Sequence, residues 1–263
     1  MTELSGTIAV VFIFYVLAML GIGMWASRMT RSPVDFFLAD RSLKAWVTAI
    51  SSTASSESAW AVLGTVGLAY KEGLSAIWFM PGCLFGYLVN WLFIAERLRK
   101  HSEENQAITL PDYFENHFDD KSHVLRMISV VIIFSCMMAY VAAQFTAIGK
   151  TFDAIFGIPH IISISVGGAI VLVYTMMGGV RAVAWTDFAQ GIIMVLGLVI
   201  LSGVALGSLG GFSGMIAEVG KTSPETLQWM GGKSAAVFFG STVGLLGIGL
   251  GYPGQPHVIT RYM

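Results

Sequence analysis

Charge is scarce in this sequence. Only 12% of its 263 residues are Asp, Glu, Lys or Arg, whereas 55% are hydrophobic, and the formal net charge is −1. Soluble domains carry roughly 25% charged residues, so an ordinary globular fold is excluded. The near-neutral balance also offers no basic surface for a nucleic acid. The composition indicates a membrane protein with a lipid bilayer around it and no nucleic-acid partner.

Cysteine and metal-ligand patterns are nearly absent. The two cysteines, Cys83 and Cys136, both lie in apolar stretches, which excludes a disulfide scaffold and favours buried thiols. His101, His117 and His123 lie in one polar loop without the spacing of a metal site. We therefore expect no metal ligation by these histidines.

Long runs without charge dominate what is present. Each run can cross the roughly 30 Å hydrocarbon core of a bilayer as a helix. The predicted spans are residues 4–27, 45–70 (which contains Glu57), 73–95 and 127–149, with one more within each of 154–180, 188–217 and 234–260. The sequence thus predicts an all-α membrane protein with seven transmembrane helices.

The basic residues are distributed unevenly between the two sides of these spans. Eleven of the 15 Lys and Arg residues fall in the loops after the first, third, fifth and seventh spans. Short loops rich in Lys and Arg stay in the cytoplasm. We expect the N-terminus outside, the end of the chain in the cytoplasm, and the protein in a plasma membrane.

The second predicted span carries an unusual polar stretch, Ser51–Trp60, with Glu57 as its one acid. A carboxylate near the bilayer centre costs on the order of 3 kcal/mol and is by default a functional candidate. Clustered serines also compete for backbone hydrogen bonds and weaken a helix. A site for an ion or polar solute is one interpretation. The alternatives are an acid paired only for packing, and serines (Ser51, Ser52 and Ser55) that bond back to their own helix.

The seventh predicted span is interrupted too. Residues 247–257 contain four glycines and two prolines, and glycine costs roughly 1 and proline roughly 3 kcal/mol inside a helix. Two interrupted helices in corresponding positions of two repeats point to a transporter site, and the second and seventh spans are five apart. Glycine pairs at four-residue spacing, Gly82/Gly86, Gly240/Gly244 and Gly247/Gly251, predict close helix packing.

Short motifs along the whole chain carry a family resemblance. They are Leu38–Leu43 (LADRSL), Thr109–Phe114 (TLPDYF), Tyr174–Gly179 (YTMMGG) with Ala182–Asp187 (AVAWTD), and Gly251-Tyr252 followed by Gly254–His257 (GQPH). With these motifs the chain resembles the sodium:solute symporter family, and within it the bacterial sodium/proline symporters. Thr109 and Pro111 also fit the start of a short helix. Gly178-Gly179 can stop the fifth span, and Thr186-Asp187 can cap the sixth.

The resemblance implies a leucine-transporter-type fold, with two inverted repeats of five helices after one extra helix. Residues 1–263 would be a truncated transporter domain, made of the extra helix (4–27), the first repeat (45–212) and the first helix of the second repeat (234–260). The rest of the second repeat would be a missing C-terminal half. We expect this chain to be a fragment of a protein about twice as long.

The resemblance also implies site residues. Sodium, the coupling ion, is expected at backbone carbonyls near Ala54 and Glu57, and substrate at Ser58, Ala59, Trp60, Tyr140, Tyr252 and Pro256. Ser56, Asp187 and Gln255 are candidates for a gating or structural role. Ser56 stands where the proline carriers have an aspartate, and Ile248 where they have a tryptophan. No metal beyond sodium and no organic cofactor is implied.

The function implied is sodium-coupled uptake of a small solute, proline or a related amino acid, across a bacterial inner membrane. No enzymatic activity is expected. An alternative of a different class is the symporter-like sensor domain of a membrane histidine kinase, and sequence beyond Met263 would separate the two.

Overall fold

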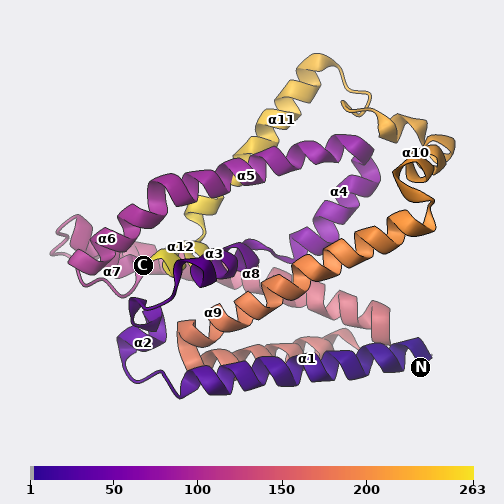
Figure 1. The fold of residues 1–263 in the computed structure, drawn as a ribbon. Helices are drawn as coiled ribbons and strands as arrows, with labels where there is room; N and C mark the ends of the chain where they lie inside the picture. Colours follow the sequence, from indigo (N-terminus) through magenta and orange to yellow (C-terminus); the bar gives the residue numbers. More distant parts are fainter. Residues whose placement is uncertain (1–2) are drawn as a thin grey trace. The chain divides into compact units, whose positions relative to one another are not determined.

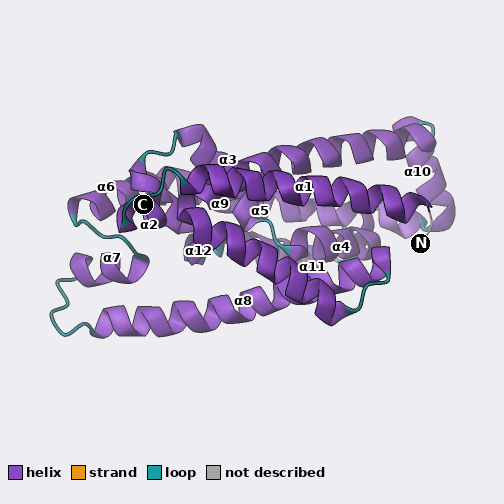
Figure 2. Ribbon diagram, turned by 90° about the horizontal axis from the view of Figure 1, so that it is seen from below, coloured by secondary structure: helices purple, strands orange, loops and turns teal. Residues whose placement is uncertain are grey.

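The computed structural model describes residues 3–263, and its described part consists of helices and loops without a strand (Figure 2). Residues 1 and 2, which the predicted 1–263 domain includes, lie outside the described part. The α-helices are α1 Glu3–Ser27, α2 Pro33–Leu38, α3 Ala45–Ser56, α4 Thr65–Glu72, α5 Phe79–Val89, α6 Glu96–Glu104, α7 Leu110–His117, α8 Val124–Phe156, α9 His160–Ser208, α10 Gly211–Thr222, α11 Ala235–Leu250 and α12 Pro256–Ile259.

Shorter helical turns connect several of these helices. The 3₁₀ turns are Ala39–Arg41, Gly73–Trp78, Pro224–Leu227, Tyr252–Gly254 and Thr260–Tyr262, and the π-helical turns are Trp60–Gly64 and Asn90–Ala95. Wider or tighter turns inside an apolar stretch mark places where the regular hydrogen-bond ladder fails. The turn Trp60–Gly64 lies in the second predicted span, where an interruption was expected, and Asn90–Ala95 lies in the third, where none was.

Helix α9 reverses direction at one glycine. A straight helix of its 49 residues would be roughly 74 Å long, more than twice the hydrocarbon thickness. Gly179 has φ 55° and ψ −147°, a conformation that L side chains avoid. The chain turns back at this residue. Figure 1 shows the first half of α9 beside α1 and the turn that leads into its second half. The predicted stop at Gly178-Gly179 is confirmed.

Five helical segments of the described residues are long and apolar enough to cross a membrane. They are Gly6–Ser27, Thr65–Glu104, Val124–Phe156, His160–Ser208 and Ala235–Gly254. Large apolar side chains on them are exposed, for example Phe14 at 75% and Val10 at 67%, as lipid contact requires. The predicted span 45–70 is not among them because its helix is broken after Ser56. The count of seven spans stays a prediction. His160–Ser208 is assigned as a single helix, but its two halves, before and after Gly179, run in different directions.

The loop motif around Thr109 forms the predicted short helix. Thr109 is the N-cap of α7, its hydroxyl accepts the Asp112 N–H, and the Asp112 carboxylate accepts the Thr109 N–H in return. This capping box satisfies two otherwise free donors. The helix therefore begins where the sequence indicated.

The chain divides into two compact units, one of Met1–Ser55, Leu98–Ala189 and Thr260–Met263, the other of Ser56–Arg97 and Gln190–Ile259. In the second unit, α5 and α11 cross at glycines (Figure 1). A Cβ on Gly86 would lie 2.0 Å from the Gly249 carbonyl oxygen, and one on Gly249 would lie 1.8 Å from the Gly82 carbonyl oxygen. The close packing predicted for Gly82 and Gly86 is confirmed, and its partner on α11 is Gly249.

The other glycine pairs on α11 do not pack in this way. Among the described residues, no atom lies within 4 Å of a Cβ built on Gly240, Gly244 or Gly247, and Gly251 meets only the carbonyl of its own neighbour Ile248. The four-residue spacing correctly predicted that glycines of α11 pack closely against another helix, but it pointed to the wrong glycines. The helix face that meets α5 carries Leu245 and Gly249 instead.

We expect Gly249→Ala and Gly244→Ala, both on α11, to have opposite effects on stability. The first forces two backbones apart, which should cost about 1–3 kcal/mol, whereas the second has open space and gains helix propensity of about 1 kcal/mol. Thermal unfolding in detergent should show a lower melting temperature for Gly249→Ala and an unchanged or higher one for Gly244→Ala. Equal melting temperatures would contradict the crossing.

Candidate functional site: two helix breaks and a buried ion pair

The first break follows α3. Glu57 and Ser58 are outside any helix, and the chain resumes as the π-helical turn Trp60–Gly64. The Ser58 hydroxyl accepts the Trp60 N–H at 3.1 Å, and the Thr65 hydroxyl donates to the Trp60 carbonyl at 3.2 Å. Side chains here take the place of backbone partners, which is how serine-rich segments leave a helix. The predicted interruption of the second span is confirmed.

The second break follows α11. After Leu250 the chain makes the 3₁₀ turn Tyr252–Gly254, and Pro256 then begins the four-residue helix α12. Pro253 and Pro256 have no N–H to give to a helix ladder, so the helix cannot continue through them. This confirms the predicted interruption of the seventh span.

Tyr87 on α5 connects these two breaks within one unit. Its hydroxyl is hydrogen-bonded to the Ser56 hydroxyl and makes a long hydrogen bond of 3.5 Å to Glu57 Oε1. Its ring stacks on that of Tyr252, with centroids 4.6 Å apart and planes 22° from parallel. The sequence reasoning missed Tyr87. Its signal was the polar spacing Cys83, Tyr87, Asn90, which puts three polar side chains on one face of an apolar span.

The other unit contains a buried ion pair centred on Asp187. Arg261 Nη2 lies 2.7 Å from Asp187 Oδ2, and the two side chains are 11% and 14% exposed. The Ser51 and Ser55 hydroxyls each donate to the same Oδ2 at 2.8 Å, and Arg261 Nε donates to Ser51 Oγ at 2.8 Å. A buried carboxylate with this many donors holds its partners in place.

Two sequence interpretations around Asp187 are corrected. Thr186-Asp187 does not cap a helix, because the helix resumes directly after Gly179 and both residues lie within it, where Thr186 donates to the Ala182 and Val183 carbonyls. Of the serines expected to bond to their own helix, Ser52 does so through the Ala49 carbonyl. Ser51 and Ser55 instead donate to Asp187.

Two arginines of this unit fix the LADRSL loop. Ala39, Asp40 and Arg41 all have φ near 50°, a conformation that non-glycine residues keep only when their surroundings hold it. Arg41 donates to the Ser102, Ala107 and Met263 carbonyls. Burial, and next the neighbouring Arg99, lowers the pKa of the Arg41 guanidinium.

Arg181 holds the same loop from α9. It pairs with Asp35 at 3.1 Å and donates to the Ala39 carbonyl at 3.0 Å. The LADRSL motif therefore contacts two other segments of its unit: the residue Arg181 after YTMMGG, and Met263 at the end of the described chain.

The predicted site residues fall into both units. Ala54, on α3, and Tyr140, half-buried on α8, belong to the first unit. The second unit contains Glu57, Ser58, Ala59, Trp60, Tyr252, Gln255 and Pro256. Within it, Tyr87 brings Ser56 and Glu57 together with Tyr252. Trp60 is 53% exposed and Tyr252 is buried.

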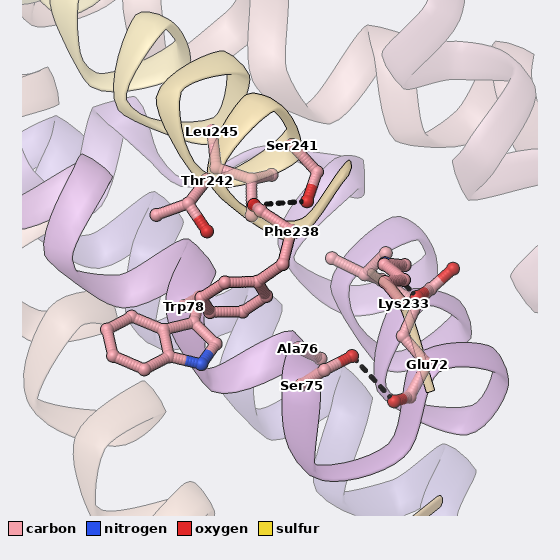
Figure 3. Close-up of a pocket in the computed structure, with 10 residues that line it drawn as sticks. Glu72, Ser75, Ala76, Trp78, Lys233, Phe238, Ser241, Thr242 and Leu245 are labelled. Atoms are coloured by element: carbon pink, nitrogen blue, oxygen red, sulfur yellow. Dashed lines mark hydrogen bonds and ion pairs between the residues drawn. The ribbon is translucent and has the colours of Figure 1, made fainter. Parts of the chain in front are cut away.

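A small cavity of about 180 Å³ lies in the second unit beside the turn Gly73–Trp78. Figure 3 shows Trp78 and Phe238 at one side of it and Glu72 with Lys233 at the other. Lys233 Nζ is 2.6 Å from Glu72 Oε2, and Trp78 Nε1 donates to the Trp229 carbonyl. These contacts tie the link between α4 and α5 to the segment that precedes α11.

The polar groups at the breaks are hydroxyls, carboxylates and backbone carbonyls. Among residues 3–263 no group of three or more His, Cys, Asp or Glu side chains could hold a metal ion. Oxygen donors at helix breaks suit a hard monovalent cation or a small polar solute.

Broken apolar helices with polar side chains at the breaks are typical of membrane transporters. The sequence profile of the sodium:solute symporter family matches residues 36–263, and the chain belongs to this family. It is 36% identical to the sodium/proline symporter of Escherichia coli (strain K12) over 261 residues, which cover 99% of this chain and 51% of that protein.

Similar relatives occur in other bacteria. The sodium/proline symporter of Staphylococcus aureus (strain bovine RF122 / ET3-1) is 38% identical over 251 residues, 95% of this chain and 48% of that protein. The osmoregulated proline transporter OpuE of Bacillus subtilis (strain 168) is 36% identical over 250 residues, 95% of this chain and 50% of that protein. The chain spans about half the length of these relatives.

We expect Asp187→Asn to destabilise the protein strongly, because it leaves the Arg261 guanidinium buried without its carboxylate. Breaking a buried pair costs about 3–5 kcal/mol. Arg261→Gln should cost a similar amount, and the double variant should cost less than the two single losses together, as thermal unfolding in detergent will measure. The exposed pair Glu218–Lys221 is the control, since Glu218→Gln should change stability by less than about 1 kcal/mol. Additive losses in the double variant would contradict the pairing.

We expect Tyr87→Phe to loosen the first break while the stacking on Tyr252 remains. The loss of one hydroxyl should cost about 0.5–1.5 kcal/mol and should speed amide hydrogen exchange at residues 57–60. Tyr70→Phe is the matched control, because Tyr70 is 90% exposed. Exchange at residues 57–60 that is equal in the two variants would show that Tyr87 does not hold the break.

Proposed function

We propose that the whole protein couples sodium influx to the uptake of proline or a related small amino acid across a bacterial inner membrane. The observation that carries this proposal is the joining of the two helix breaks by Tyr87, which bonds to Ser56 and Glu57 and stacks on Tyr252. Family membership and the names of the relatives support it. The relatives named above are transporters and lend no support to the sensor alternative.

The proposed architecture has seven spans in residues 3–263. One extra helix precedes a repeat of five, and α11 begins a second, inverted repeat; the N-terminus is outside. The support is the reversal of α9 at Gly179 and the breaks in helices five spans apart. In a protein of the relatives' length, later helices would complete both the repeat and the sodium site.

In this proposal sodium binds backbone carbonyls near Ala54 and Glu57, where the helix ladder ends and carbonyls are released for an ion. The solute lies against Ser58, Ala59 and Trp60, with Tyr140, Tyr252 and Pro256 as further lining. The Glu57 carboxylate supplies negative charge near the ion. Its contact with Tyr87 favours an indirect role for this side chain, in which the carboxylate is not itself a sodium ligand. Asp187 with Arg261 forms an inner latch, and Gln255 follows the second break.

The energetics are sufficient for uptake. One cation that crosses about 100 mV gains roughly 2.3 kcal/mol, and a tenfold sodium gradient adds roughly 1.4 kcal/mol. Together these permit accumulation of the solute by several hundred-fold, since roughly 1.4 kcal/mol is a factor of ten.

The test is uptake of radiolabelled proline by the whole protein in liposomes with an inward sodium gradient. We expect uptake that disappears when potassium replaces sodium. Glu57→Gln keeps the backbone carbonyl and should raise the sodium concentration for half-maximal uptake by about twofold to tenfold, a loss of about 0.4–1.4 kcal/mol. Ser56→Asp, which introduces the acid of the proline carriers, should keep sodium dependence.

Two results would contradict the proposal in different ways. Uptake that is equal in sodium and potassium would refute sodium coupling. A Glu57→Gln variant that is inactive even at saturating sodium would show that the carboxylate itself is the ligand.

A further inference from the structure

One face of the third predicted span carries three polar side chains toward the second break. Cys83 is hydrogen-bonded to Tyr252, Tyr87 stacks on the Tyr252 ring, and the turn that starts at Asn90 contacts Tyr252–Gly254. Asn90 follows Gly86 by one turn, and Gly86 itself lies against Gly249 and Tyr252. The face thus follows the broken segment of α11 and its continuation.

Asn90 is the anomalous member of this face. Its side chain is completely buried, and neither its Nδ2 nor its Oδ1 has a hydrogen-bond partner among the described residues. Gln255, directly after the 3₁₀ turn Tyr252–Gly254, also has a buried Oε1 without a partner in this part of the chain. A buried polar group that makes no hydrogen bond is costly to keep. Asn90 also begins a π-helical turn, a feature that is frequent at functional sites.

The chemistry of these groups selects a ligand class. The Asn90 amide offers two N–H donors and one acceptor, and the Gln255 oxygen is a further acceptor. A bare cation would use the oxygens and leave the Nδ2 donors unsatisfied. A zwitterion, with a carboxylate and an ammonium close together, uses donors and acceptors alike and adds no net charge to a buried neutral site.

We propose that Asn90 is a solute-recognition residue, whose carboxamide donates to the carboxylate of a small α-amino acid beside the Tyr252–Gln255 segment. This rests on the proposed function and adds the group that recognises the solute. The sodium ligands proposed above, near Ala54 and Glu57, are other residues, so changes at Asn90 should affect solute binding and leave sodium binding as it is.

The test uses the whole protein in detergent, with shifts of the melting temperature on addition of sodium alone and then of proline. Asn90→Leu has a similar volume and removes the unsatisfied amide. We expect it to melt at or above the wild-type temperature without ligand, to keep the sodium shift, and to bind proline at least tenfold more weakly. Asn90→Asp, which replaces the donors by an acceptor, should weaken proline binding at least as much. Asn105→Leu, in the exposed loop after α6, is the matched control.

The outcomes separate the inference from the function on which it rests. If the wild type shows no proline-induced shift, the proposed function fails. If the wild type responds and both Asn90 variants bind proline within twofold of it, the inference alone is overturned. A packing role for Asn90 predicts a lower melting temperature and equal losses of the sodium and proline shifts, which would also overturn it. If Asn90→Leu does not fold, Asn90→Asp, with the same shape as asparagine, decides.

Discussion

Backbone N–H and C=O groups in the hydrocarbon core have no water to bond, so a transmembrane helix can break only where protein groups or a wet cavity replace the lost partners. The first break of this chain, after Ser56, meets that condition through side chains. Ser58 and Thr65 bond to the backbone around Trp60, and the Tyr87 hydroxyl lies against Ser56 and Glu57. The glycine crossing of α5 and α11 places the helix that carries Tyr87 against the second break, where its ring stacks on Tyr252.

The interruptions could be predicted from sequence because their causes are local. Serine clusters, paired glycines and prolines act on the helix that contains them, so the breaks after Ser56 and Leu250 and the turn at Gly179 follow from a few neighbouring residues. The cap at Thr109 follows for the same reason. Contacts between segments that are distant in the sequence were harder to predict, and the glycines of α11 show why. Spacing predicts that some face packs, but which face depends on the partner helix.

The parts of the candidate site that sequence reasoning missed depend on partners far along the chain. Nothing next to Asp187 announces that Ser51, Ser55 and Arg261 will surround its carboxylate. The position of Asp187 before a long apolar stretch favoured a helix cap. In the structure the helix resumes directly after Gly179, so Asp187 lies inside it and its carboxylate pairs with Arg261 instead. Tyr87 was likewise hidden in an apolar span, where a tyrosine is an ordinary packing residue until its hydroxyl is located.

The two polar centres differ in how their polar groups are satisfied, and the difference bears on function. At Asp187 one carboxylate oxygen accepts from two serines and an arginine, an arrangement that is complete without a ligand. Such a centre suits a structural tie or a latch that opens only when its partners separate. On the face formed by Cys83, Tyr87 and Asn90, the first two side chains have hydrogen-bond partners, whereas the Asn90 amide has none in the described chain. The buried Asn90 amide, which has no hydrogen-bond partner in the described chain, is therefore free to take a ligand. The Asp187 carboxylate already has its partners and is not.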